Sequence, residues 1–135
     1  MVNKKVKAKY KSVLLLDDND LDNFINQKIL EGTLFCNKVY VNTSSVSAIE
    51  FIKNLCTADK SLLPEVMFVD LNMPVMDGFQ FIEGLIKQFP DVFETTKIVI
   101  LTTSLDPVDQ SKAKSISDKI IFLNKPLSEQ SLHKI

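Results

Sequence analysis

VMFVDLNMPVMDGF, residues 66–79, decides the fold, because a short apolar run (66–69) stops there at a single aspartate, Asp70. A continuous apolar run of this length, rich in Val, is typical of a strand that is covered on both faces. The residues after Asp70 include Pro74 and Gly78, which favour a loop. The stretch therefore predicts a buried strand that places a carboxylate at the point where the strand ends.

Similar strand candidates recur at steady intervals, at 13–16, 38–41, 98–101 and 120–123. Helical patterns separate them. Strands that alternate with helices predict a parallel sheet with helices on both faces. We therefore expect a single α/β domain with five parallel strands and five helices, in which ligands bind outside the carboxyl ends of the strands.

The expected helices are identified by apolar residues at a spacing of three or four. We expect Gly32 to cap the first helix and Pro90 to end the third. A fourth helix is expected to start at 106–109 and a last one within 128–135. The apolar stripes of the first three helices are Leu21, Phe24, Ile25 and Ile29; Ala48, Phe51, Ile52 and Leu55; and Phe79, Ile82, Ile86 and Phe89.

Length and composition indicate one globular domain, with 135 residues, 45% hydrophobic and 24% charged. No apolar run is long enough to cross a bilayer, which argues against a membrane protein. The N-terminal sequence lacks the apolar core of a secretory signal, so we expect a cytoplasmic location. Cys36, Cys56 and His133 are too few and too scattered for a disulfide framework or a zinc site.

The charge is unevenly distributed along the chain. All 16 cationic residues are lysines, and five of them fall within residues 1–11. We expect this segment to be a basic tail and residues 12–135 to be the folded domain. Without the tail the chain is acidic, and it contains no arginine, so we expect the domain not to bind nucleic acid.

Polar residues follow four of the five predicted strands. Asp17 and Asp18 follow the first, Asp70 the third, Thr102 lies at the end of the fourth, and Lys125 lies just beyond the fifth. In a parallel sheet these groups meet at one edge. Clustered carboxylates suit Mg²⁺, and a lysine with a hydroxyl suits a phosphoryl group. The pattern predicts phosphoryl transfer in which the carboxylate of Asp70 is the nucleophile.

With these residues the chain resembles the receiver domain of bacterial response regulators, in particular the stand-alone, chemotaxis-regulator-like type. The resemblance covers residues 12–135, although the last helix is shorter than usual. It rests on four motifs in order: LLLDDN (14–19), VDLNMPVMDGF (69–79), ILTTS (100–104) and FLNKPL (122–127). The resemblance implies a flavodoxin-like (βα)5 fold and a place in a two-component phosphorelay.

The resemblance also implies a role for each residue of the site. Asp70 would be the phosphorylated residue, and Asp18 and Asp70 would bind Mg²⁺ directly, helped by Asp17. Asn72 would add its backbone carbonyl to the metal, and Lys125 would pair with the phosphoryl group. The bond between Lys125 and the proline after it is typically cis in this family.

The resemblance further implies a conformational switch, in which the hydroxyl of Thr102 and the aromatic ring of Phe122 would take part. The implied partners are a sensor histidine kinase or a histidine phosphotransfer protein upstream, and a downstream protein that recognises the switched surface. We expect no enzymatic activity beyond self-catalysed phosphoryl transfer and dephosphorylation.

Three alternatives remain open from the sequence. A haloacid-dehalogenase-like phosphatase would have a second Asp two residues after the nucleophile, where this chain has Asn72. A nucleotide-binding domain would need a glycine-rich loop, and the chain has three glycines in all. A receiver-like module that binds proteins without being phosphorylated is the third alternative, and such domains usually lack an acid or the lysine.

Overall fold

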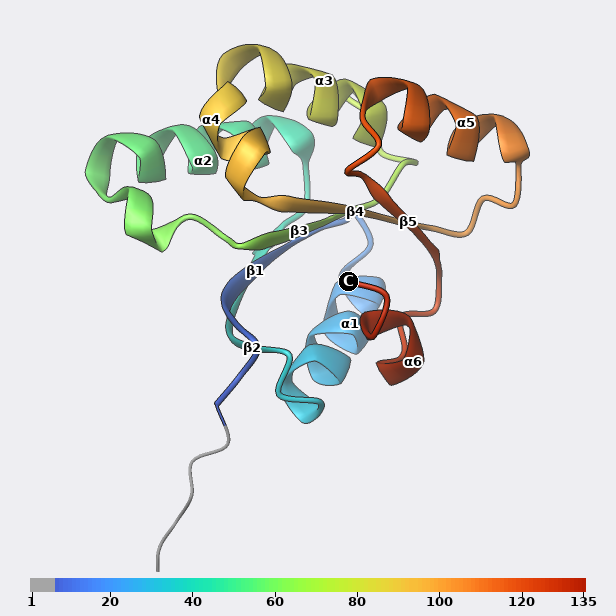
Figure 1. Cartoon of the computed structure of the whole chain (residues 1–135), viewed down its shortest axis with the longest axis horizontal. Helices are drawn as coiled ribbons and strands as arrows, with labels where there is room; N and C mark the ends of the chain where they lie inside the picture. Colours follow the sequence, from blue (N-terminus) through green and yellow to red (C-terminus); the bar gives the residue numbers. More distant parts are fainter. Residues whose placement is uncertain (1–6) are drawn as a thin grey trace, which may run out of the picture.

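Five parallel strands form one sheet in the computed structural model, which describes residues 7–135 (Figure 1). Their order in the sheet is β2-β1-β3-β4-β5, so the order reverses between β1 and β3. The predicted five-stranded parallel sheet is confirmed. The strands are β1 (Tyr10–Leu16), β2 (Cys36–Asn42), β3 (Val66–Val69), β4 (Lys97–Thr102) and β5 (Ile121–Asn124).

Helices cover both faces of this sheet, as predicted (Figure 1). One face carries α1 (Asp20–Gly32) and the short α6 (Glu129–Leu132). The other face carries α2 (Ser45–Ala58), α3 (Gly78–Gln88), α4 (Pro90–Thr95) and α5 (Pro107–Ile116), and a 3₁₀ turn at Lys60–Leu62 follows α2. Within residues 7–135, no helix is long and apolar enough to cross a membrane.

The core consists of two layers, because successive residues of a strand point to opposite faces. Leu14, Met67 and Ile100 belong to the layer under α2, α3 and α5. Val13, Phe68 and Val99 belong to the layer under α1 and α6. The central strands are therefore buried on both sides, which explains why their sequences are continuous apolar runs.

The sheet begins earlier than the sequence analysis placed it. Tyr10 and Lys11, assigned there to the basic tail 1–11, are the first residues of β1. The backbone N–H of Tyr10 donates to the carbonyl of Phe35 over 3.0 Å, and Tyr10 pairs in register with Cys36. The tail prediction for residues 1–6 lies outside the described residues.

The helix α1 packs differently from the prediction. Of its predicted apolar stripe, Leu21, Phe24 and Ile25 are 65%, 59% and 43% exposed. The residues buried against the sheet are instead Asn23, Asn26 and Leu30. The cause lies in the polar contacts of this helix with the edge of the sheet, described below.

One of the two predicted helix ends differs from the prediction, and the other has a second role. Gly32 is the last residue of α1, and the capping position belongs to Thr33, whose hydroxyl donates to the carbonyl of Ile29 over 2.8 Å. Pro90 does stop α3, but it also starts α4, where a proline without an N–H is tolerated in the first turn. No predicted helix corresponds to α4.

Candidate functional site

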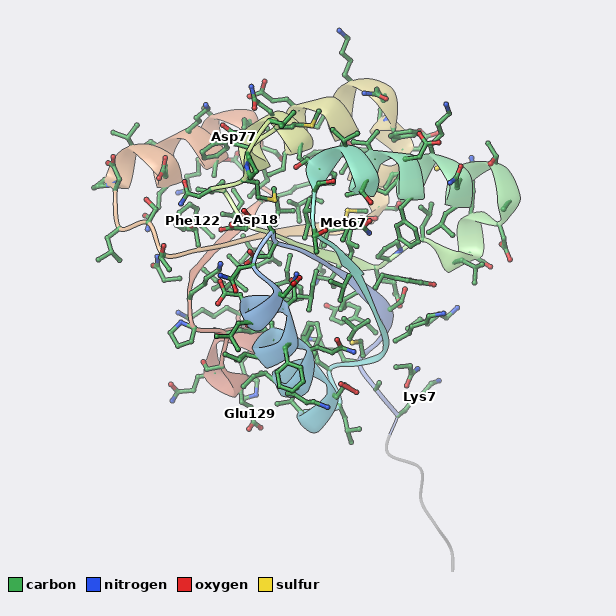
Figure 2. All side chains as sticks on the ribbon, turned by 180° about the vertical axis from the view of Figure 1, so that it is seen from behind. Lys7, Asp18, Met67, Asp77, Phe122 and Glu129 are labelled. Carbon is green, nitrogen blue, oxygen red and sulfur yellow. The ribbon has the colours of Figure 1, made fainter. Side chains whose placement is uncertain are left out.

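The site lies at the carboxyl edge of the sheet, where the strand order reverses. Leu16 of β1 pairs in register with Val69 of β3, so the next residues, Asp17 and Asp70, emerge side by side. Figure 2 shows Asp18 at this end of β1 and Lys7 beyond the other end. Ligands of open α/β sheets bind at such a reversal.

Three carboxylates form the acidic part of the site. Asp17, Asp18 and Asp70 each offer an oxygen, and these oxygens all lie within 4.8 Å of one another. Asp17 and Asp70 are only 5% and 7% exposed, whereas Asp18 faces solvent. The predicted meeting of the three acids is confirmed.

Lys125 reaches into this cluster from the end of β5. Its Nζ lies 2.6 Å from Asp17 Oδ2, 2.9 Å from Asp22 Oδ2 and 3.5 Å from Asp70 Oδ1. Burial disfavours the charged ammonium, but the hydrogen bonds to Asp17 and Asp22 outweigh it, and the pKa of Lys125 lies above its usual value. The lysine therefore stays cationic at the centre of the site.

The surroundings of Asp70 disfavour the ionised form of its carboxyl group. Burial, followed by the neighbouring charge of Asp17, raises the pKa of Asp70 to about 6. Lys125 and the backbone N–H of Asn72 act in the opposite direction but do not compensate fully. The ionised form of Asp70 would therefore be stabilised by a further positive charge in the site.

The donor set fits a divalent cation that prefers oxygen ligands, such as Mg²⁺. Both oxygens of Asp17 are engaged, one by Lys125 and the other by the backbone N–H of Asn19 at 2.9 Å. Asp18 and Asp70 are thus the direct carboxylate ligands that the geometry favours, with Asp17 in a supporting place. The backbone carbonyl of Asn72 as a metal ligand stays a prediction.

The loop after Asp70 passes close to the strand that it leaves. A Cβ on Gly78 would lie 2.4 Å from the backbone oxygen of Asp70 and 2.9 Å from the Cα of Leu71. No glycine among residues 7–135 has a positive φ, so Gly78 is required for this close approach and not for an unusual backbone angle. The left-handed residue of the loop is Val75, at φ 69° and 94% exposed.

The two predicted switch residues lie on neighbouring strands. Thr102, at the end of β4, is fully buried, and its hydroxyl oxygen accepts from the backbone N–H of Ser104 over 3.1 Å. Phe122 on β5 is half-buried at a groove of about 410 Å³ that α5 also lines. The Lys125–Pro126 bond is cis, as the resemblance implied.

Three residues of α1 belong to the site and were missed by the sequence analysis. Asp22 pairs with Lys125, and the buried Asn23 donates through Nδ2 to the backbone oxygen of Asp17 over 2.8 Å. Asn26 is buried one turn further along. Nothing in the sequence distinguished Asp22 or the two asparagines from surface residues of the helix.

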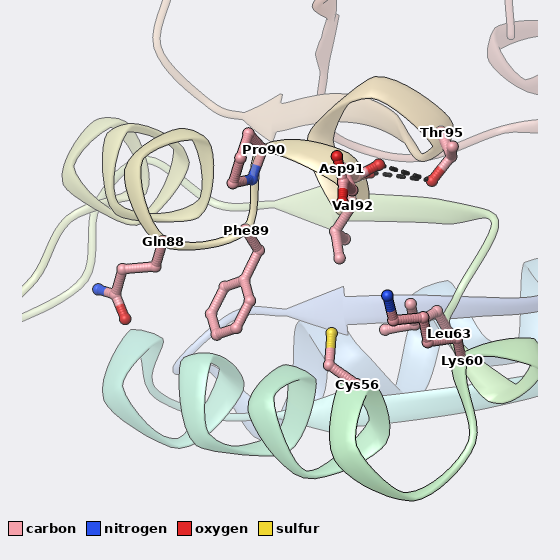
Figure 3. A pocket seen from close by; sticks show the side chains of 9 residues that line it. All are labelled: Cys56, Lys60, Leu63, Gln88, Phe89, Pro90, Asp91, Val92 and Thr95. Atoms are coloured by element: carbon pink, nitrogen blue, oxygen red, sulfur yellow. Dashed lines mark hydrogen bonds between the residues drawn. The ribbon is translucent and has the colours of Figure 1, made fainter.

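The structure also has a cavity of about 400 Å³ at the opposite edge of the sheet, between α2, α3 and α4 (Figure 3). Cys56, Phe89 and Val92 give it an apolar wall, and Lys60 lies at its border. None of the predicted site residues lines this cavity, so it is separate from the acidic cluster.

Comparison with known proteins gives a consistent result. The family model described as the response regulator receiver domain matches residues 13–135. Response regulator Rcp1 from Synechocystis is 29% identical over 94 residues, which are 70% of this chain and 63% of Rcp1. A transcriptional regulatory protein of Bacillus subtilis, YhcZ, is 42% identical over 57 residues, 25% of its length. The chain thus spans less than two thirds of these curated relatives.

Solved structures match over most of the chain. A two-component response regulator from Cytophaga hutchinsonii superposes with a TM-score of 0.86 at 33% identity, covering 93% of both chains. The Mn²⁺-bound form of Rcp1 has a TM-score of 0.71 at 26% identity and covers 92% of this chain and 87% of its own. The chemotaxis protein CheY4 of Vibrio cholerae, at 24% identity and a TM-score of 0.68, shares the fold; it covers 96% of this chain and 95% of its own.

Proposed function

The chain belongs to the response regulator receiver domain family, and on this premise we propose that it accepts a phosphoryl group on Asp70. The donor is a phosphohistidine of a sensor histidine kinase or of a histidine phosphotransfer protein. The observation that carries the proposal is the position of the Asp70 carboxylate, within 4.8 Å of the acidic pair and 3.5 Å from the ammonium of Lys125. The phosphatase alternative loses its support, because Asp70 follows β3 and Asn72 replaces the second acid.

The transfer needs an ionised nucleophile and a neutralised phosphoryl group. An oxygen of Asp70 attacks phosphorus, forming the P–O bond of an acyl phosphate while the P–N bond to the imidazole breaks. Lys125 is held 2.6 Å from Asp17 and donates to a phosphoryl oxygen as the group arrives. Asp18 and Asp70 would hold Mg²⁺, which would supply further charge neutralisation. A solved relative, Rcp1, is described in a Mn²⁺-bound form.

The buried hydroxyl of Thr102 then binds the phosphoryl group, and this contact changes the surface of the domain. In the present structure it accepts from the N–H of Ser104, and its proton is free to point to a phosphoryl oxygen. As Thr102 moves, Phe122 turns inward from the groove between α5 and β5. A downstream protein partner reads this changed surface, in keeping with a shift between two populated states.

The upstream partner binds beside the site, on α1. Leu21, Phe24 and Ile25 are exposed apolar side chains on this helix. Ile25 also lines a groove of about 230 Å³ that Lys125 and Pro126 border. Exposed apolar residues next to a reacting group mark an interaction surface, here one that positions the donor histidine.

The cytoplasmic location stays a prediction.

The test is the intact mass of the protein after incubation with acetyl phosphate and Mg²⁺. We expect the labile gain of one phosphoryl group, dependent on Mg²⁺ and absent in Asp70→Asn. Asp106→Asn is the matched control, because Asp106 is an exposed aspartate that caps α5, and this variant should be labelled like the wild type. No gain, under conditions that label a known receiver, would support the alternative of a module that binds proteins without phosphorylation.

A further inference from the structure

The buried face of α1 carries two amides beside the acidic cluster. Asn23 and Asn26 are 4% and 5% exposed, while three apolar residues of the same helix, Leu21, Phe24 and Ile25, are 65%, 59% and 43% exposed. Burying an amide costs free energy unless its polar atoms find partners. A helix that buries these two in place of available apolar side chains therefore points to a role for them at the site.

The orientation of the Asn23 amide is fixed by chemistry. Its nitrogen faces the backbone oxygen of Asp17 at 2.8 Å, and only an N–H can donate to that carbonyl. The side-chain oxygen Oδ1 of Asn23 is then buried without a protein partner, one of two such side-chain atoms among the described residues. This oxygen requires a donor that the surrounding protein does not supply.

A small cavity lies beside the Asn23 side chain. Asn23 and Asn26 line it together with Asp17 and Asp70, and the rest of its wall is apolar: Leu15, Leu16, Phe68 and Leu101. About 10 Å³ is open to the centre of a water molecule, which is room for a single water. Polar groups on several sides of a cavity of this size are the usual surroundings of an internal water.

We propose that this cavity binds one internal water, which links the two asparagines of α1 to the carboxylate of Asp70. The water donates one proton to Asn23 Oδ1 and accepts from the amide of Asn26. Both oxygens of Asp17 have close donors, at 2.6 and 2.9 Å, whereas Asp70 has the backbone N–H of Asn72 and the more distant Lys125, at 3.5 Å, and its carboxylate has room for a further donor. The second proton of the water therefore goes to Asp70.

Asn23 and Asn26 are then positioning residues that act on Asp70 through this water. The water hydrogen-bonds one oxygen of the Asp70 carboxylate and so fixes the orientation of this group. The other oxygen of Asp70 faces the incoming phosphorus. This consequence for transfer rests on the proposed function, but the water itself does not. The two parts are tested by separate measurements.

The first measurement detects the water in the labelled, metal-free protein by nuclear Overhauser effects between water and the side-chain amide protons of Asn23 and Asn26. We expect a long-lived water at both amides of the wild type. We expect it to be absent in Asn26→Leu, because the apolar side chain fills the cavity. Wild-type amides without a long-lived water contact would overturn the proposal, whether or not the protein can be phosphorylated.

The second measurement compares rates of phosphorylation by acetyl phosphate at saturating Mg²⁺. Loss of a hydrogen bond to a charged group should slow Asn26→Leu by roughly tenfold. Asn26→Ala leaves room for the water, so it should react faster than Asn26→Leu although it is less stable. A residue that served packing alone would give the opposite order, and that result would refute the positioning role.

Ser45→Ala is the matched control. Ser45 is the other described residue with a buried side-chain atom lacking a partner, and it lies at the start of α2, outside this cavity. Its variant should keep both the water signals and the wild-type rate. Should the wild type itself resist phosphorylation, the proposed function fails, while the first measurement still decides the water.

Discussion

Asp70 is held where its charge is unfavourable in the metal-free protein. The folded-state pKa of about 6 exceeds the ordinary value of 3.8, because burial and Asp17 disfavour ionisation. The protonated form therefore favours the fold. This stabilisation is fully present below about pH 4 and is lost as the pH rises through about 6. A bound cation reverses the penalty, which couples metal binding to the stability of the site.

The first prediction concerns this titration. Without metal, the wild type should lose about 3 kcal/mol of unfolding free energy between pH 4 and pH 7 relative to Asp70→Asn, which cannot ionise. Urea denaturation of both proteins in a chelator, at several pH values, measures the difference. Parallel stability curves for the two proteins would show that Asp70 does not titrate in this range.

Gly78 and Gly84 give a matched pair on one helix. Gly78→Ala places a Cβ 2.4 Å from the backbone of Asp70, so we expect a loss of about 2 kcal/mol and slower phosphorylation. At Gly84 a Cβ would meet only ordinary contacts, at 3.9 Å and beyond, so Gly84→Ala should stabilise the helix by up to about 1 kcal/mol. Denaturant unfolding distinguishes the two, and equal effects would contradict the steric account.

Lys125 is predicted to matter for stability as well as for transfer. Lys125→Met leaves the buried carboxylates without their counter-ion, at a cost of about 3 kcal/mol at pH 7. The loss should shrink at pH 4, where Asp70, with a pKa of about 6, is protonated. Lys119→Met is the control, because its ion pair with Glu94 is exposed and should change stability by less than about 1 kcal/mol. A pH-independent loss at Lys125 would argue against the electrostatic cause.

At the scale of the element, α1 shows what a periodic pattern can predict. The spacing of Leu21, Phe24 and Ile25 predicted a helix, and α1 exists. It also indicated a packed face, which is wrong, because these residues are exposed and the asparagines face the sheet. The hydrogen bond from Asn23 to Asp17 and the burial of Leu30 both stabilise the rotation that this helix has. Periodicity identifies the residues that share a face, but local polar contacts decide which face is buried.

The exposed apolar residues of α1 give a prediction about the upstream partner. Phe24→Glu should slow phosphotransfer by roughly tenfold from any histidine kinase that labels the wild type, because a charge interrupts the apolar contact. Its reaction with acetyl phosphate, which needs no docking, should be unchanged. Val46→Glu, at a 56% exposed position on α2, is the matched control and should transfer normally. An unchanged rate for Phe24→Glu would place the docking surface elsewhere.

For the whole molecule, the sequence predicted the strands and the sheet edge at which the polar residues following them come together. Asp17, Asp18, Asp70 and Lys125 come together because each follows a buried parallel strand. The strand order and the helix α4 required the structure, because apolar runs do not reveal which strands are neighbours. The contacts of α1 with the site also required it, since they depend on how the helix rotates against the sheet.

The central claim is that Asp70 becomes an acyl phosphate, and borohydride trapping tests it most directly. After reaction with acetyl phosphate and Mg²⁺, hydride reduces an aspartyl phosphate to homoserine and releases phosphate. Peptide mass spectrometry then locates the modified residue. We predict homoserine at position 70 alone, and none when Mg²⁺ is withheld. Homoserine at another aspartate, or a protein that carries phosphate yet keeps an intact Asp70, would contradict the claim.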